Sequence, residues 1–371
     1  MSKHRITVMS PLLPPKDELG ILLDEIWESR IITNQGIFHD TLESKLSSYL
    51  KVPALSLMTN GTSALICAIR SLGITGEIIT TPYSFAATAH AIHWCGLKPV
   101  FVDIDPNTCN IDPNKIEAAI TSKTSAILPV HVYGQPCDTE QIEKIARNYG
   151  LKVIYDAAHA FGVEERGESI LNRGDISIVS FHATKVYNTI EGGAIICKDK
   201  MLRKQIEYLR NFGFEDEISI VMPGINAKMD ELRSAYGLVN LRYVSQAIEK
   251  RRELANRYRE LLTDMPGLSL MRELPDVKYN YAYFPVFIDA GSFGMTRDQL
   301  YTLLTKSGIL CRRYFYPLIS SFNLYNLELS ARTTNLTVAA FKAESVLCLP
   351  LHQELTFDDI EYIIRTIKEE I

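Results

Sequence analysis

Short apolar runs alternate with helical patterns between about residues 54 and 199 of the chain. The apolar runs predict strands at Glu77–Thr81, Pro99–Ile104, Ser125–Val132, Lys152–Asp156, Ile176–Phe181 and Gly193–Cys197. Between several of them, the spacing of apolar residues predicts helices at Thr62–Leu72, Ala86–Cys95, Asp112–Ile120 and Thr139–Tyr149. This alternation is typical of an α/β fold with a mainly parallel sheet covered on both faces. Such sheets bind ligands outside the carboxyl ends of their strands, so we expect functional residues directly after strands.

The rest of the chain has a different pattern, which predicts a small C-terminal α+β domain. A helical stretch covers Met229–Leu262, with a break or bend expected near Tyr243. After it, the pattern predicts a strand, a helix, a strand and a terminal helix, at Tyr283–Ile288, Thr296–Ser307, Ile309–Tyr316 and Asp358–Glu370. The arm before Gly36 contains Pro11, Pro14 and Pro15 and is expected to be extended. We therefore expect a large domain with this arm over residues 1–240 and a small domain over residues 241–371.

Composition narrows the possible partners and the compartment. The 371 residues include 39 basic and 44 acidic side chains, for a net charge of −5, which argues against a nucleic-acid surface. The seven cysteines are scattered without a C-x-x-C pair, so we expect no disulfides, no metal site and a reducing cytoplasm. No apolar run approaches the roughly 18 residues of a membrane span, so none is expected.

A single lysine follows one of the predicted strands, at the end of the string Ser180–Lys185. A glycine pair, Gly192 and Gly193, comes soon after it. Burial beside a strand disfavours the charged form of a lysine and lowers its pKa. Lys185 would then be a usable nucleophile toward an aldehyde. The alternative interpretation is a surface lysine in a loop.

An aspartate ends another predicted strand. Asp156 closes the apolar run Lys152–Asp156 and would face the ligand edge of the sheet. A carboxylate there can pair with a protonated pyridine nitrogen and hold the ring as an electron sink. The alternative is that Asp156 caps a helix. His159, three residues later, could equally be a polar residue of the core.

Two further segments follow predicted strands and open predicted helices. Gly61, Thr62 and Ser63 begin a helix, and the free N–H groups of a helix start suit a phosphate. A capped helix start that binds nothing is the alternative. Phe85 could stack on a flat heteroaromatic ring, although an isolated phenylalanine can also belong to the core.

The order of these residues resembles the fold-type-I enzymes that use pyridoxal 5′-phosphate (PLP). The detailed strings are similar to those of the DegT/DnrJ/StrS family of sugar aminotransferases, and the resemblance extends from Thr33 to Leu351. The matching strings are NGTSAL at Asn60–Leu65, FVDID at Phe101–Asp105, PVHVYG at Pro129–Gly134, DAAHAFG at Asp156–Gly162 and SFHATK at Ser180–Lys185. This resemblance implies an aspartate-aminotransferase-like large domain with a small C-terminal domain.

The resemblance also implies roles for these side chains in holding PLP. Lys185 would form the covalent link to the cofactor, and Asp156 would contact the pyridine nitrogen. His159, where many members have Gln, would lie near the 3-hydroxyl of the ring, and Phe85 would stack on it. The phosphate would be held by the remaining candidates Gly61, Thr62, Ser63 and Ser180.

The segment Gly224–Asn226 resembles one that donates an asparagine to the phosphate of the neighbouring subunit. Asn226 would therefore belong to an active site shared across a homodimer. Most members carry Arg two residues later, where this chain has Lys228. A lysine cannot reproduce the bidentate contacts of an arginine, so that role is in doubt here.

The reaction implied by the resemblance has two halves. An amino donor, glutamate in most of the family, converts PLP to pyridoxamine phosphate, which then condenses with a ketone on a sugar. Lys185, freed from its link, would move the proton between cofactor and sugar carbon. Some members are dehydratases with His in place of this lysine, and Lys185 argues against that branch.

The substrate is suggested by the segment Cys311–Leu318, which resembles the part of the chain over the sugar site. It lacks the HYP…H pattern of 3-amino-forming and several UDP-sugar members, and it looks closer to 4-aminotransferases acting on dTDP-4-keto-6-deoxyglucose. The product would be dTDP-4-amino-4,6-dideoxyglucose, used for surface polysaccharide or O-antigen. The candidate substrate contacts are Arg313, Tyr314 and Tyr316. A 3-keto or UDP-linked keto-sugar, or a non-catalytic regulatory relative on the same fold, are the alternatives.

Overall fold

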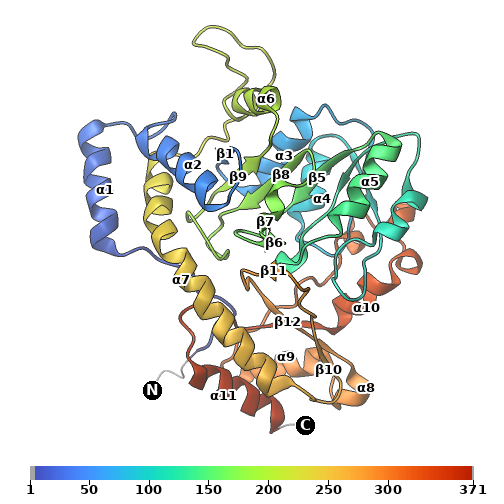
Figure 1. The fold of residues 1–371 in the computed structure, drawn as a ribbon. Coiled ribbons are helices and arrows are strands. Elements are labelled where there is room, and N and C mark those ends of the chain that lie inside the picture. The colour runs from blue at the N-terminus through green and yellow to red at the C-terminus, as the bar shows by residue number, and fades with distance from the viewer. Residues whose placement is uncertain (1–4, 370–371) are drawn as a thin grey trace.

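A seven-stranded sheet forms the centre of the molecule (Figure 1). The computed structural model describes residues 5–369. The strands lie in the order β1-β9-β8-β5-β4-β2-β3, and only β9 runs antiparallel to its neighbours. Their bounds are Leu55–Met58 (β1), Glu77–Thr80 (β2), Lys98–Phe101 (β3), Thr124–Leu128 (β4), Lys152–Asp156 (β5), Ile176–Ser180 (β8) and Gly193–Ile196 (β9). The expected α/β fold with a mainly parallel sheet is therefore confirmed.

Helices cover both faces of this sheet, because alternate strand residues point to opposite sides. In β5, Ile154 packs into the core beneath α3, α4 and α6, whereas Val153 and Tyr155 pack beneath α5. The second face is completed by α2 and α7 over β1, β8 and β9. The helix bounds are Ile37–Tyr49 (α2), Gly61–Ser71 (α3), Ala87–Trp94 (α4), Thr139–Tyr149 (α5), Lys200–Arg210 (α6) and Glu231–Leu262 (α7).

The C-terminal part builds a second, smaller layer around an antiparallel sheet in the order β10-β12-β13. Its strands are Leu268–Leu270 (β10), Phe284–Ile288 (β12) and Val346–Leu349 (β13), and its helices are Ala290–Phe293 (α8), Arg297–Lys306 (α9), Thr337–Ser345 (α10) and Phe357–Lys368 (α11). The helix α7 passes from the large sheet to this part, so the domain boundary expected after residue 240 falls inside it (Figure 1). The small strands β6 (Glu164–Glu165), β7 (Glu168–Ser169) and β11 (Val277–Lys278) pair between the two parts.

Two expected features of the first part of the chain are wrong. The arm before Gly36 is not extended throughout, because α1 occupies Lys16–Ser29 directly after Pro15. Proline fits at a helix start, and Asp17 and Glu18 in the first turn favour its dipole. The helix expected over Asp112–Ile120 is two short 3-10 turns. Pro113 and Ile116 are the buried residues of this segment, and two buried positions are too few to hold a longer helix.

Two expectations for the C-terminal part are also wrong. Helix α7 runs without the break expected near Tyr243. The segment Ile309–Tyr316 is not a strand, because it changes partner along its length: Ile309 bridges to Ile6 and Arg312 to Cys348. The expected terminal helix is present as α11, and Glu370, its expected end, lies outside the described residues.

Candidate active site

Asp156 lies at the carboxyl end of β5, buried beneath the first turn of α4. The Thr88 hydroxyl of α4 donates to Oδ2 at 2.8 Å, and the Ala158 amide donates to Oδ1 at 3.1 Å. Burial raises the pKa of Asp156, while these hydrogen bonds and the charge of Lys185 oppose that rise. The carboxylate is thus held rigidly at the edge of the sheet where ligands bind, and Lys185 supplies the nearby positive charge.

Lys185 lies on the loop that joins β8 to β9, with its side chain partly buried. Its Nζ donates to the Oη of Tyr283 at 3.4 Å and lies 6.0 Å from the centre of that ring. Burial lowers the pKa of Lys185 to about 8, and the nearby Asp156 and Tyr314 counteract part of this shift. A substantial fraction of the amine is therefore neutral near physiological pH, as a nucleophile toward an aldehyde requires.

His159 is buried three residues after Asp156 and lies among aromatic rings. Phe315 stacks on its imidazole at 5.6 Å, and Tyr283 meets it edge-on at 5.0 Å. The backbone N–H of Tyr133 donates to Nδ1 at 3.2 Å, so a neutral ring carries its hydrogen on Nε2. Burial and the charge of Lys185 lower the pKa of His159 well below its usual value, which keeps the ring neutral.

The start of α3 meets the end of β8 closely. A Cβ added to Gly61 would lie 3.0 Å from the Cβ of Ser180, so a larger residue would require the Ser180 side chain to move by a few tenths of an ångström. The Ser63 amide already donates to Oδ1 of Asn60 at 2.8 Å, as in a capped helix. In the described part of the chain, the amides of Gly61 and Thr62 have no such partner. These two N–H groups, close to the Ser180 side chain, are therefore available as donors, the arrangement that an anion at a helix start requires.

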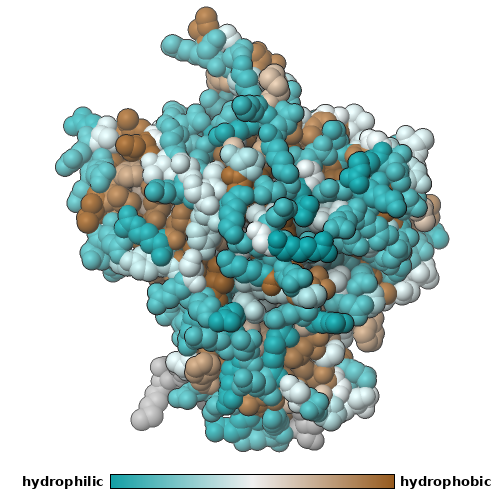
Figure 2. Space-filling model, viewed as in Figure 1, coloured by the Kyte–Doolittle hydropathy of each residue, from teal (hydrophilic) through white to brown (hydrophobic). Residues whose placement is uncertain are grey.

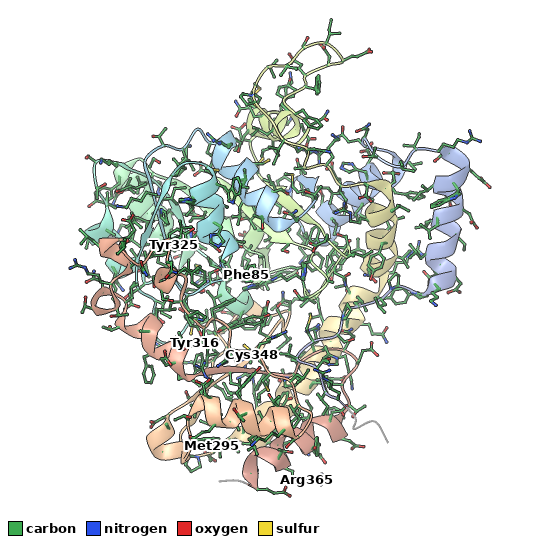
Figure 3. All side chains as sticks on the ribbon, turned by 180° about the vertical axis from the view of Figure 1, so that it is seen from behind. Phe85, Met295, Tyr316, Tyr325, Cys348 and Arg365 are labelled. Atoms are coloured by element: carbon green, nitrogen blue, oxygen red, sulfur yellow. The ribbon has the colours of Figure 1, made fainter. Side chains whose placement is uncertain are left out.

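Phe85 precedes the first turn of α4, and its ring is 61% exposed. Its carbonyl accepts from the Thr88 amide at 3.2 Å, so the ring sits one turn from the residue that holds Asp156. Figure 3 shows Phe85 between the large sheet and the C-terminal part. An exposed aromatic ring in this position has room for a flat partner.

The structure places the other candidates apart from this cluster or at its rim. Asn226 is exposed on the loop between α6 and α7, where its Oδ1 accepts from Lys228 Nζ at 3.2 Å. Arg313 pairs with Asp298 at 2.9 Å, on the side of α9, and Tyr316 lies 4.6 Å from the Arg297 guanidinium. In the described part of the chain, none of these three residues forms a hydrogen bond, ion pair or ring contact with Lys185 or Asp156.

Tyr314 is different from its neighbours Arg313 and Tyr316, because it joins the aromatic cluster. Its ring lies 5.8 Å from that of Tyr283 and affects the pKa of Lys185. The carbonyl of Tyr314 accepts hydrogen bonds from the hydroxyls of Tyr133 and Tyr83. The structure therefore brings Lys185, Asp156, His159, the α3 start and Tyr314 together.

Four residues of the cluster were not singled out from the sequence: Thr88, Tyr133, Tyr283 and Phe315. Thr88 could have been found, because it follows Phe85 at helical spacing. Tyr133 lies within the PVHVYG string. Phe315 lies within the segment Cys311–Leu318, which resembles the part of the chain over the sugar site. Tyr283 reaches the site from the C-terminal part, and no local signal connects it to the site.

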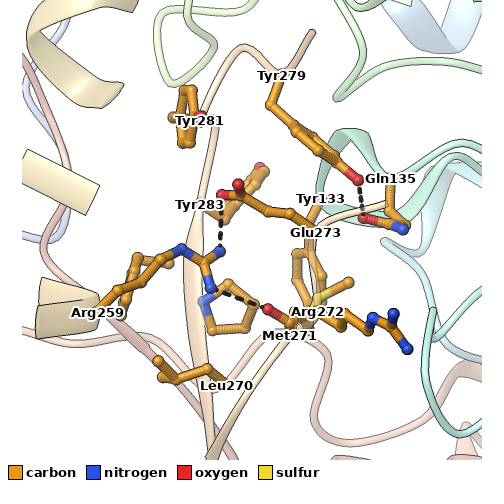
Figure 4. A pocket seen from close by; sticks show the side chains of 12 residues that line it. Tyr133, Gln135, Arg259, Leu270, Met271, Arg272, Glu273, Tyr279, Tyr281 and Tyr283 are labelled. Carbon is orange, nitrogen blue, oxygen red and sulfur yellow. Dashed lines mark hydrogen bonds and ion pairs between the residues drawn. The ribbon is translucent and has the colours of Figure 1, made fainter. Parts of the chain in front are cut away.

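A pocket behind the cluster shares Tyr133 and Tyr283 with it (Figure 4). Arg259 in its lining pairs with Glu273 at 2.9 Å and donates to a backbone carbonyl. Arg272 also lines the pocket, so the pocket combines tyrosine rings with positive charge. Over residues 5–369, no group of His, Cys, Asp and Glu suits a metal ion, and no helix is long and apolar enough to span a membrane.

The chain is 48% identical over 365 residues to the dTDP-4-amino-4,6-dideoxy-D-glucose transaminase of Shigella dysenteriae, covering 98% of each protein. It is also 48% identical over 369 residues to the transaminase of the same name from Escherichia coli, covering 99% of each. The solved structure of DesI in the presence of its TDP-sugar product matches with a TM-score of 0.94 and 34% identity, covering 100% of this chain and 93% of that one.

A family model matches almost the whole chain. The match covers residues 16–368 and therefore includes all three sheets and every candidate site residue. The order of strand-end motifs, the lysine with a lowered pKa and this match lead to the same assignment. The chain belongs to the DegT/DnrJ/EryC1/StrS aminotransferase family.

Proposed function

We propose that the protein uses PLP to transfer an amino group from glutamate to C4 of dTDP-4-keto-6-deoxyglucose. The observation that carries this proposal is the placement of Lys185, with a pKa lowered to about 8, beside the buried carboxylate of Asp156. The similar transaminases from Shigella dysenteriae and Escherichia coli are named for the product of this reaction. DesI, which is similar in fold, was solved with a TDP-sugar product.

The residues present fit PLP at both of its ends. The unpaired amides of Gly61 and Thr62, with the Ser180 hydroxyl, suit its phosphate. The buried Asp156 carboxylate suits the protonated pyridine nitrogen. The exposed ring of Phe85 supplies a face for stacking. Ser63 would contribute less than expected to the phosphate, because its amide is occupied by Asn60.

When bound, PLP supplies an electron sink for negative charge at the carbon that carries the amino group. Asp156 keeps that sink effective by holding a positive charge on the ring nitrogen. Lys185 Nζ can accept a proton from the amino donor and return one to the sugar carbon, since its pKa of about 8 is close to the working pH. Neutral His159, which cannot add a second positive charge, leaves Lys185 as the basic group of the cluster.

The sugar nucleotide would approach from the segment that contains Arg313, Tyr314 and Tyr316. Tyr314 already borders Lys185, so it is the candidate for contact with the sugar itself. The Arg313 guanidinium has N–H donors beyond the one that contacts Asp298, and these could bind a diphosphate. Tyr316 lies beside it and could pack against the base. Each assignment is part of the proposal.

We further propose a homodimer in which Asn226 acts in the partner's site. Several apolar side chains of the N-terminal segment are exposed: Ile21, Trp27, Ile31 and Ile32. Figure 2 shows the resulting apolar surface over α1 and beside α7. Lys228 donates a hydrogen bond to the amide oxygen of Asn226. The NH₂ group of Asn226 can then donate to a phosphate. The seven free thiols support a cytoplasmic location.

The test is to incubate the protein with PLP, glutamate and dTDP-4-keto-6-deoxyglucose, and to identify the product by NMR. We expect amination at C4. The comparison uses the 3-keto isomer and a UDP-linked 4-keto sugar under identical conditions. A preference of more than about tenfold in kcat/KM for either of them, or about 1.4 kcal/mol, would overturn the substrate assignment.

A further inference from the structure

The hydroxyl of Tyr283 is the hydrogen-bond partner of Lys185 in the described chain, at 3.4 Å from Nζ. Tyr283 comes from the C-terminal part, one residue before β12, and none of the matching strand-end motifs includes it. Its ring is fixed on three sides by His159 at 5.0 Å, Tyr133 at 5.7 Å and Tyr314 at 5.8 Å. The phenol is therefore held in one orientation, with its oxygen toward the amine.

The backbone that carries Tyr283 is fixed to the large sheet. The Asn280 side chain is buried, and its amide donates to the carbonyls of His159 at 2.8 Å and Phe161 at 3.0 Å. Those carbonyls belong to the loop directly after Asp156. Asn280 thus fixes the segment that leads to Tyr283 at the same edge of the sheet that carries the site, so the distance to Lys185 is set by the fold.

The chemistry of the phenol suits a partner for an amine that gains and loses protons. Burial raises the pKa of Tyr283, so its hydroxyl stays protonated throughout the pH range of an aminotransferase. A neutral phenol oxygen can accept a hydrogen bond from either the ammonium or the amine form of Lys185. When Tyr283 accepts a hydrogen bond from the ammonium form of Lys185, it stabilises that form. This opposes the lowering of the lysine pKa by burial.

We propose that Tyr283 is a positioning residue for Lys185, which holds the Nζ atom at the reaction centre whenever the lysine is not linked to the cofactor. This proposal rests on the proposed aminotransferase function, because Lys185 must be released in each half-reaction before it can move a proton. The contact orients the lysine from the C-terminal part of the chain, whereas Asp156 and His159 belong to the large sheet and the loop after it. Misplacing a catalytic group by about 1 Å can cost roughly a hundredfold in rate.

The experiment compares Tyr283→Phe with the matched control Tyr281→Phe. Tyr283→Phe keeps the ring that packs on His159 and removes only the hydroxyl. Tyr281 lies two residues earlier on the same segment and lines the pocket of Figure 4. In the described part of the chain, the side-chain partner of Lys185 is Tyr283 and not Tyr281. Thermal unfolding of the full chain checks that both variants fold as the wild type does.

The first readout requires no turnover. The full-length, cofactor-free chain is labelled with limiting acetic anhydride at a series of pH values, and acetylation of Lys185 is followed by peptide mass spectrometry. We expect the midpoint for Lys185 to fall by about one pH unit in Tyr283→Phe, because the ammonium form loses its hydrogen bond. The midpoint in Tyr281→Phe should equal that of the wild type.

The second readout is the glutamate half-reaction of the PLP-loaded protein, followed by stopped-flow absorbance. Tyr283→Phe should react roughly tenfold to a hundredfold more slowly at saturating glutamate, with unchanged cofactor binding. An unshifted Lys185 midpoint in Tyr283→Phe, or an equal shift in Tyr281→Phe, would overturn the positioning role. A shifted midpoint in a protein whose wild type does not react with glutamate would instead refute the proposed function alone.

Discussion

The hydroxyl of Thr88 lies 2.8 Å from Oδ2 of Asp156. Helix α4, which follows β2, thus holds the carboxylate at the end of β5. This contact affects how readily Asp156 takes up a proton. Burial raises the pKa of Asp156, and the Thr88 hydrogen bond is the largest of the effects that oppose the rise. Thr88 thus maintains the charged form that the proposed pyridine contact requires.

Replacing Thr88 should therefore shift the acid side of the pH profile. Thr88→Val keeps the shape of the side chain and removes the donor, which raises the pKa of Asp156 further. The carboxylate is mainly charged above its pKa. As the pH falls, the variant should therefore lose activity at a higher pH than the wild type does. We expect the acid limb of kcat/KM for glutamate to move up by about one pH unit.

The control for this prediction is Thr88→Ser, which retains the hydroxyl. Its acid limb should coincide with that of the wild type. At pH values above both pKa values, Thr88→Val should approach wild-type activity, since the carboxylate is then charged in both proteins. An acid limb that does not move in Thr88→Val would assign the contact to packing alone.

The lowered pKa of Lys185 gives a prediction for cofactor binding. The cofactor-free protein should combine with PLP at a rate that rises with pH and levels off near 8, instead of near the ordinary lysine value of 10.5. The bound form should be yellow, should bleach with glutamate and should be trapped by borohydride. Lys185→Ala should lose the trapped link, and Lys198→Ala, at an exposed site, should keep it. A rate that continues to rise up to about pH 10 would contradict the burial of this amine.

The proposed sharing of sites between subunits can be tested by complementation. Lys185→Ala and Asn226→Ala should each be inactive as homodimers. If Asn226 acts in the partner's site, a hybrid dimer contains one intact site, and an equal mixture should recover about a quarter of wild-type activity. Subunit exchange is verified with differently tagged chains. If exchange occurs without recovery, Asn226 acts within its own subunit or not at all.

The sequence predicted those site residues that lie directly at strand ends, and it missed those that tertiary packing brings in. Asp156 and Ser180 end strands whose apolar runs are clear, and α5 lies where it was expected because Asp138 caps it and Gly150 ends it in a left-handed conformation. Ligands bind at the edge of the sheet where the parallel strands end, so the part of the candidate site in the large domain could be predicted. Tyr283 was not predicted, because tertiary packing alone brings it to Lys185, and the sequence did not predict that Phe315 stacks on His159.

The wrong expectations have similarly physical origins. Prolines before residue 16 suggested an extended arm, although proline directly before a helix is compatible with it. In Ile309–Tyr316, apolar and aromatic residues suggested a strand, but the alternation of side chains does not reveal which neighbours are available for pairing. The segment meets Ile6 and Cys348 at single positions and forms no ladder.

The last prediction concerns stability and His131, which lies after β4 in the PVHVYG string. Its ring is fully buried against Tyr155, at 4.9 Å between centres, and Nδ1 accepts from the Cys137 amide at 3.0 Å. Burial lowers the pKa of His131 from 6.5 to about 3. Between these values the unfolded chain binds a proton that the folded chain does not, so the free energy of unfolding must decrease as the pH falls below 6.5.

His131→Asn retains an acceptor for the Cys137 amide and cannot titrate in this range. The wild type should be more stable than this variant at neutral pH, because the ring packing is lost. That advantage should shrink by about 1.4 kcal/mol for each pH unit between roughly pH 6 and pH 4, as His131 becomes protonated only in the unfolded chain. Urea unfolding at each pH measures the difference, with His93→Asn as a control at an exposed position. A difference that stays constant with pH would show that His131 is protonated within the fold, and its burial would then have to be compensated by an acceptor at Nε2.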